Sequence, residues 1–253
     1  MKKIIGLALL TALLSACGGS DSKNPNVRLG GSNYGYSNNQ IQPETKVSEK
    51  APLNRLHVSG VGKSHGAQRL FRISEKDYDI IVPGMTNPNV RNGVMRHQEK
   101  NDGLLITRET LPNLQYSRAG MMTFRDEASN DYESRIFQQG VGANNLPSSG
   151  TASYKGTAVT MTGKGSSAGD INMNVDFGSK NLSGRLNNTI NTVAGDQING
   201  LDFSGQLSGN TFKANSGTTN FSGGLYGDTG EEFAGTLLDN SRQINGYFGG
   251  HRQ

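Results

Sequence analysis

The sequence has no tryptophan and a single cysteine among its 253 residues. One cysteine cannot form an intramolecular disulfide, and it excludes a cysteine-rich zinc or iron–sulfur site. Apolar residues make up 33% of the chain and charged residues 18%, which is too lean for the core of a large α/β enzyme. Glycine, by contrast, occurs 35 times, about twice its average frequency. This composition favours turns and thin sheets over long helices.

The first sixteen residues have the pattern of an export signal. Lys2 and Lys3 precede an apolar stretch from Ile4 to Leu14 that is too short to span a bilayer stably. The sequence Leu-Ser-Ala-Cys-Gly-Gly that follows resembles the lipobox of bacterial lipoproteins, in which the cysteine thiol is acylated. We therefore predict a lipoprotein signal peptide over residues 1–16 and lipid attachment at Cys17. An unlipidated secreted protein is the alternative.

The net charge gives no indication of a nucleic-acid partner. Cleavage of the signal peptide would remove Lys2 and Lys3 and lower the formal charge of +4 by two. No block of basic residues interleaved with aromatic residues remains in the rest of the sequence. The predicted location is the bacterial outer membrane, where the lipid would hold the protein at the cell surface.

Residues 17–51 contain few apolar side chains. They are mainly Gly, Ser, Asn, Gln and Lys, with only scattered Val, Leu and Ile. Such a segment cannot bury enough apolar surface to offset the entropy of the chain. We therefore predict a flexible, disordered tether, with a reach on the order of 30 Å by the scaling of flexible chains.

Residues 52–145 have an irregular pattern that predicts a smaller, loop-rich β domain. Short apolar runs predict strands at 56–62, 78–82, 104–107 and 121–124. Residues 66–73 fit either a strand or a helix. Turns are predicted at Pro83-Gly84 and Asn87-Pro88-Asn89.

Residues 146–253 are more regular, because short runs recur at intervals of about 8–12 residues between Gly or Asn. From Ile171 to Phe177, apolar residues alternate with polar ones, which is typical of a strand with one dry and one wet face. The eight runs are 152–161, 171–177, 181–187, 200–207, 211–214, 221–226, 232–238 and 244–248. Eight antiparallel strands of this length can close into an up-and-down barrel that side chains fill.

Other features of these runs agree with a closed barrel. Glycines that fit tight inward positions occur within them: Gly156, Gly184, Gly205, Gly223, Gly235 and Gly246. An open sandwich is the alternative. An outer-membrane barrel would need an apolar outward face on each strand. The outward positions carry polar residues instead: Asn172, Asn174, Asp176, Gln243 and Asn245. The predicted fold class is all-β, with a C-terminal eight-stranded antiparallel β-barrel preceded by the smaller β domain and the tether.

Three segments of the C-terminal region resemble a known family of surface lipoproteins. Leu146 to Ala158 reads LPSSGTASYKGTA, and Asp170 to Gly184 reads DINMNVDFGSKNLSG. The third segment, from Ser222 to Gly250, contains SGGLYG, EEFAG and GYFGG in that order. These segments are similar to the opening strand, the VDF hairpin and the closing strands in the barrels of factor H binding protein and transferrin-binding protein B.

The resemblance implies a surface lipoprotein without enzymatic activity that contributes to virulence. It implies export by a surface lipoprotein assembly modulator and binding of a host macromolecule. Members of the family bind complement factor H, transferrin, lactoferrin, or haem and haemoglobin, so the barrel alone does not name the ligand. Residues 52–145 match no family pattern, and no binding residue is transferred to this sequence.

Candidate ligand-binding residues lie in the N-terminal β domain. His57 and His65 bracket a glycine-rich run and could ligate haem iron, although ordinary exposed histidines have the same pattern. Arg69 and Arg72 flank Phe71 and could present a cationic face to a protein, or could simply face water. No other cofactor and no metal site is predicted.

The candidate hydrolase and nucleotide-binding segments do not hold up. Ser148-Ser149-Gly150 lacks the Gly-x-Ser-x-Gly pattern of a nucleophile elbow, and the sequence has no HExxH pair. The Gly-Lys at 163–164 lacks the preceding spaced glycine of a phosphate-binding loop. We therefore predict a surface-exposed lipoprotein that binds a host serum or haemoglobin-type protein, either an iron or haem carrier or a complement regulator such as factor H. The alternative is a periplasm-facing structural or assembly lipoprotein of the envelope.

Overall fold

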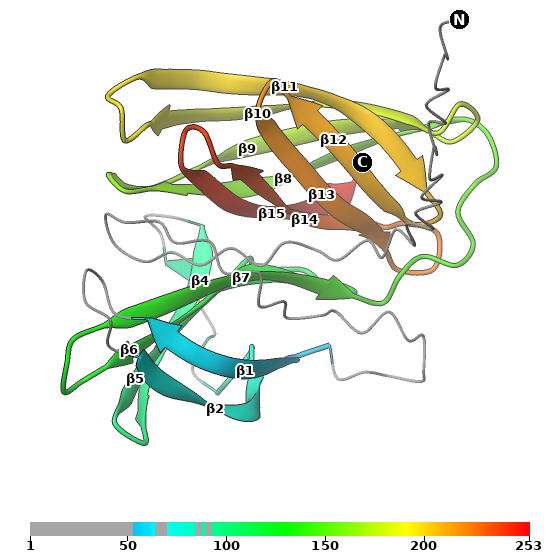
Figure 1. Cartoon of the computed structure of the whole chain (residues 1–253). Helices are drawn as coiled ribbons and strands as arrows, with labels where there is room; N and C mark the ends of the chain where they lie inside the picture. The colour runs from blue at the N-terminus through cyan, green and yellow to red at the C-terminus, as the bar shows by residue number, and fades with distance from the viewer. Residues whose placement is uncertain (1–52, 64–69, 84, 86–87, 90–92) are drawn as a thin grey trace, which may run out of the picture.

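The computed structural model describes residues 53–63, 70–83, 85, 88–89 and 93–253 (Figure 1). The predicted signal peptide, Cys17 and the tether lie outside these residues. The described part of the chain is built from strands, which confirms the predicted all-β class. Figure 1 shows three layers, with the barrel above, an open sheet in the middle and a hairpin below.

The C-terminal strands form the predicted closed barrel. Its strands are β8 (Thr151–Thr162), β9 (Gly165–Asp176), β10 (Asn181–Asn191), β11 (Gln197–Ser208), β12 (Thr211–Ser216), β13 (Thr219–Tyr226), β14 (Glu232–Asp239) and β15 (Ile244–Arg252). Each pairs antiparallel with its neighbours in sequence, and β15 returns to pair with β8. Tight turns connect the strands, so the topology is up-and-down.

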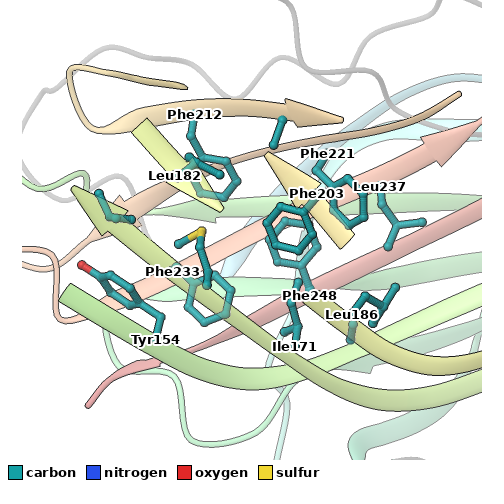
Figure 2. Close-up of a cluster of buried hydrophobic side chains, with 14 of the residues drawn as sticks. Tyr154, Ile171, Leu182, Leu186, Phe203, Phe212, Phe221, Phe233, Leu237 and Phe248 are labelled. Atoms are coloured by element: carbon teal, nitrogen blue, oxygen red, sulfur yellow. The ribbon is translucent and has the colours of Figure 1, made fainter. Parts of the chain in front are cut away.

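The interior of the barrel is filled by apolar side chains. Ile171, Met173 and Val175 are no more than 1% exposed, which confirms the predicted alternation of β9. Phenyl rings occupy the middle of the barrel: Phe203 stacks on Phe221 with ring centroids 4.5 Å apart, and Phe248 lies 6.1 Å from Phe221 (Figure 2). The rings give the barrel a continuous core.

Glycines opposite these rings make room for them. Gly184 pairs with Phe203, and a Cβ atom on Gly184 would lie 2.2 Å from the ring of that phenylalanine. Gly235 pairs with Phe248, and a Cβ atom there would lie 2.3 Å from the Phe248 ring. A large residue thus covers a glycine across the strand pair, which confirms the predicted inward glycines.

The N-terminal strands form a hairpin and a five-stranded sheet. The hairpin consists of β1 (Arg55–Lys63) and β2 (Leu70–Asp79). The sheet consists of β3 (Pro88–Asn89), β4 (Val94–Asn101), β5 (Leu104–Thr110), β6 (Ser117–Asp126) and β7 (Tyr132–Gly140), in that order.

Both faces of the five-stranded sheet are covered. One face packs on the hairpin, where Ile106 and Phe124 meet Ile73. The other packs on the outside of the barrel, where Ile136 belongs to the same buried cluster as Val159. The sheet is therefore the middle layer of the molecule (Figure 1).

Several local predictions in the N-terminal region were wrong. The strand predicted at 78–82 is the end of β2, which stops at Asp79 because the chain bends at Ile80 and Ile81. Pro88 and Asn89 form β3 where a turn was predicted, while β4 and β7 were not predicted at all. Residues 70–73 are strand; the rest of the ambiguous 66–73 run lies outside the described residues.

The outer face of the barrel also differs from the prediction on one side. Asn174 and Asp176 are exposed, but Asn245 is 1% exposed. Tyr247, two residues further along β15, is completely buried. The reason is that β8, β14 and β15 turn their outer faces toward the five-stranded sheet.

Candidate binding surface

The structure describes only part of the predicted candidate residues. Cys17, His65 and Arg69 lie outside the described residues. His57 lies on β1 with its backbone opposite Asp77, and Arg72 lies on β2 opposite Val61, but their side chains are not among those described. Haem ligation by the two histidines and protein binding by the two arginines therefore stay predictions.

The described residues suggest a different surface at the junction of sheet and barrel. Large apolar side chains are exposed at three described positions: Tyr116 (39%), Val141 (52%) and Val193 (42%). Tyr116 and Val141 are neighbours, because the amide of Val141 donates to the carbonyl of Tyr116 at 2.8 Å. We call these two residues the junction patch. Val193 lies at the other end of the barrel, between β10 and β11.

Main-chain hydrogen bonds hold the junction patch from both sides. Beyond Gly140 the chain continues in extended form, and Gly142 forms a bridge with Tyr226 of β13. The amide of Gly227 donates to the carbonyl of Val141 at 3.0 Å. Val141 thus bonds on one side to the loop before β6 and on the other to the barrel, so the hydrogen bonding is continuous across the junction.

A buried carboxylate of the barrel fixes the loop that carries Tyr116. Glu232 of β14 is 1% exposed. It accepts hydrogen bonds from the amides of Gln115 (2.5 Å) and Tyr116 (3.0 Å) and from the hydroxyl of Ser117 (2.8 Å). Hydrogen bonds to a buried charge are among the stronger ones in proteins, so the backbone at Tyr116 has little freedom.

A buried tyrosine closes the junction beneath the patch. The hydroxyl of Tyr226 donates to Oε1 of Gln138 on β7. Burial raises the pKa of Tyr226 above its ordinary value, which keeps the phenol protonated as a donor. Gly140 is required at this point, because a Cβ atom on it would lie 2.3 Å from the ring of Tyr226.

The described chain begins beside the same junction. Gln139 donates through Nε2 to the carbonyl of Leu53 at 2.8 Å, and Arg118 donates through Nε to Oδ1 of Asn54 at 2.9 Å. Burial lowers the pKa of Arg118, an effect that the Glu232 carboxylate opposes. Leu53 and Asn54 are therefore held against β6 and β7, on the strands that flank the junction patch.

At the other end of the barrel a second buried carboxylate has a structural role. Asp239 accepts hydrogen bonds from the hydroxyls of Thr218, Thr219 and Ser241 and from Nε of Arg242. Burial alone would raise the pKa of Asp239, but these hydrogen bonds outweigh it and lower the pKa below its ordinary value. The carboxylate ties the β12–β13 turn to the β14–β15 turn.

The arrangement at the junction suits protein binding. Tyrosine is enriched among residues that dominate the energy of protein interfaces, and a fixed backbone reduces the entropy lost on binding. No group of three or more His, Cys, Asp or Glu side chains within the described ranges could hold a metal ion. In the same ranges there is no helix of the length and apolarity that crossing a bilayer requires.

The sequence did not reveal the junction patch. Tyr116 follows the turn-forming Pro112 and Asn113, and an aromatic residue in a loop is a weak signal on its own. Its importance depends on Glu232, which is more than a hundred residues away in the chain.

Comparison with known proteins shows what the barrel is similar to. Residues 146–252 match the family model of the C-lobe and N-lobe beta barrels of transferrin-binding protein B, and this confirms the resemblance seen in the sequence. Searches among curated proteins found no match.

Solved structures of transferrin-binding protein B have a similar fold. Intact Ap-TbpB, with its N and C lobes, is 17% identical with a TM-score of 0.52; the similarity covers 78% of this chain and 46% of that one. A variant of the vaccine antigen transferrin binding protein B from Haemophilus parasuis Hp5 is also 17% identical, with a TM-score of 0.52. The similarity covers 78% of this chain and 45% of that one. At this identity the similarity establishes the fold alone. The chain spans less than half the length of either structure, yet the similarity extends beyond the barrel.

Proposed function

We propose that the protein is a lipid-anchored surface protein of a bacterium that binds a host iron-carrier protein of the transferrin type. The observation that carries this proposal is the match of residues 146–252 to the barrels of transferrin-binding protein B. The similarity of fold over 78% of the chain supports it. The proposal involves recognition and no catalytic step.

In this proposal Cys17 carries the lipid and residues 17–51 are the tether. A surface lipoprotein assembly modulator would deliver the chain to the outer face of the outer membrane. Replacement of Cys17 by Ala should abolish partitioning into detergent, because no other cysteine could be acylated. Unchanged partitioning would contradict the anchor.

The side of the outer membrane on which the domain lies distinguishes this function from the alternative, a structural role in the periplasm. Protease treatment of intact cells should remove the domain if it lies at the cell surface. Survival of the domain in intact cells, with loss after the outer membrane is permeabilised, would favour the periplasmic role.

We assign the junction patch as the part that contacts the host protein. Tyr116 and Val141 present apolar surface on a backbone that is held from two sides. An aromatic anchor of this kind typically contributes about 2 kcal/mol or more to a protein interface.

The test is a binding measurement with purified full-length protein and human transferrin in its iron-loaded and iron-free forms. Tyr116→Ala should weaken binding about 30-fold, the equivalent of about 2 kcal/mol. Val193→Ala is the matched control, because it shortens a similarly exposed apolar side chain at the other end of the barrel, and it should leave binding unchanged.

Two results would change the proposal. Binding of lactoferrin, haemoglobin or factor H in place of transferrin would retain a host-binding protein but replace its ligand. Equal losses in Tyr116→Ala and Val193→Ala would remove the junction patch as the contact.

A further inference from the structure

A polar groove lies on the outside of the barrel, away from the junction patch. It has a volume of about 440 Å³ and crosses β9, β10 and β11. Amide and hydroxyl side chains dominate its lining. The lining residues are Ser167, Ala168, Arg185, Asn187, Asn188, Thr189, Asn199 and Gly200.

A β-bulge forms the floor of this groove. Leu186 pairs with Leu201 and Thr189 pairs with Asn199, so two residues of β10 oppose the single Gly200 of β11. Gly200 has a φ of +83°, and a Cβ atom on it would lie 2.9 Å from Nη2 of Arg185. Bulges and strand glycines often mark places where another molecule approaches the backbone closely.

Hydrogen bonds within the barrel wall fix part of the lining. Asn188 is 8% exposed; it donates through Nδ2 to Oγ1 of Thr160 at 2.8 Å and accepts from the hydroxyl of Ser167 at 2.8 Å. The bond to Thr160 ties β10 to β8, and the bond from Ser167 ties β10 to β9 beyond their last backbone pair, Asn187 with Asp170. One wall of the groove is therefore preorganised.

Two amides remain available to a ligand. Oδ1 of Asn187 accepts from Nε of Arg185 at 2.9 Å, and Oδ1 of Asn199 accepts from the hydroxyl of Thr189 at 3.4 Å. Both asparagines are exposed residues, and within the described ranges their amide nitrogens donate to no acceptor. Each can donate to an oxygen atom placed in the groove.

The charge of the groove limits the ligand that it can bind. Arg185 is the only ionisable residue of the lining, and its Nη1 lies 2.6 Å from Oδ2 of Asp202. The ion pair cancels the positive charge, and the Asp202 carboxylate would repel an anion. Amides, hydroxyls and near-zero charge suit a ligand that is neutral and rich in hydroxyl groups.

We propose that this groove binds a neutral saccharide, with Asn187 and Asn199 donating to its hydroxyl oxygens and Thr189 beside them. The inference is independent of the proposed binding of an iron carrier. The groove lies on β9, β10 and β11, whereas the junction patch lies in the loops next to β6 and β7, so the two proposed contacts share no residue.

The test is saturation-transfer NMR on the full-length protein in detergent micelles. D-galactose, D-mannose and N-acetyl-D-glucosamine are the probes, and N-acetylneuraminic acid is the charged comparison. At least one neutral sugar should receive saturation. The double variant Asn187→Ala with Asn199→Ala should reduce that signal about tenfold, the loss expected when hydrogen-bond donors are removed.

Asn174→Ala is the matched control, because Asn174 is an exposed asparagine on the outer face of β9 that does not line the groove. It should retain the full signal. The proposal is overturned if no neutral sugar receives saturation, if only the acidic sugar does, or if the double variant and the control give equal signals.

Discussion

The barrel closes on itself and keeps one face of each strand dry, whereas the five-stranded sheet is open and buries both of its faces. The barrel core consists of residues from the barrel strands and their flanking loops. The five-stranded sheet forms one hydrophobic core with the hairpin and a second one with the outer face of the barrel. The interior of the barrel is therefore self-sufficient, while the sheet depends on its neighbours.

The largest expected difference between the regions comes from removing a ring from each core. Phe221→Ala should lower the free energy of unfolding by about 3–5 kcal/mol, because its ring contacts those of Phe203 and Phe248. Amide exchange should accelerate in every barrel strand and also in the sheet that rests on them. Phe124→Ala, which removes a fully buried ring of the sheet, should accelerate exchange in the sheet and leave the barrel protected.

Loss of amide protection in the barrel of Phe124→Ala would contradict this difference between the regions. If Phe124→Ala opened the barrel as well, the two regions would be one cooperative unit. Lys213→Ala, on the exposed outer face of β12, is the control and should change neither region.

The next largest effect is expected at the contact between the regions. Glu232→Ala should cost about 2–3 kcal/mol, because it leaves the amides of Gln115 and Tyr116 without their acceptor. Amide exchange at these two positions reports the change directly. Glu127→Ala breaks an exposed ion pair with Lys100 and should cost less than about 1 kcal/mol. Equal costs for the two variants would mean that Glu232 does not join sheet and barrel.

Glycine substitutions should lower the free energy of unfolding by different amounts in the two regions, and the difference should be smaller than those above. In the barrel, Gly235→Ala places a Cβ atom 2.3 Å from the ring of Phe248, so we expect a loss of about 2 kcal/mol from overpacking. In the sheet, Gly103→Ala meets no atom within 4 Å but forces a φ of +78° on alanine, which costs about 1 kcal/mol. Chemical denaturation of both variants measures the difference. A larger loss for Gly103→Ala would mean that the barrel core can shift to accept a methyl group.

The smallest difference between the regions is expected in the acid dependence of stability, and it concerns two aspartates, one in each region. The pKa of Asp239 is lowered in the fold from an ordinary value of 3.8, so its stabilising contribution is complete above about pH 4 and is lost as the pH falls further. Asp239→Asn should therefore weaken the dependence of stability on pH in this acid range. Asp126 of the sheet is only half-buried, and its pKa is lowered by the amides of Ser129 and Ala128; Asp126→Asn should change the acid dependence less. Acid titration monitored by circular dichroism compares them, and equal slopes for the two variants would contradict the difference in burial.

The barrel strands could be predicted because one face of each is continuously apolar. The prediction for β10 ended at Asn187, four residues early, because the next buried position is the polar Asn188, although burial alternates as far as Asn191. On β8 both Ala158 and Val159 are buried, since one faces the interior and the other faces the sheet. An alternation of apolar and polar residues identifies a strand with one buried face, and it does not predict that the five-stranded sheet covers the other face.

Strand β7 was missed because its charges are inside. Glu133 and Arg135 form a buried ion pair at 2.7 Å with side chains 3% and 2% exposed. Charged residues in a sequence are expected to be exposed to solvent. In β7 they are buried, because both faces of the five-stranded sheet are covered. The junction patch was missed for a similar reason, since Tyr116 owes its position to Glu232 on a distant strand.

The filled interior has an evolutionary consequence. A barrel packed with phenyl rings has no lumen in which a ligand could lie, so selection for a new ligand must act on its outside (Figure 2). Along β9 to β12 most outward residues are exposed and make no contribution to the core. These positions can diversify without loss of the fold, while substitution of the inward residues and glycines would disturb the core.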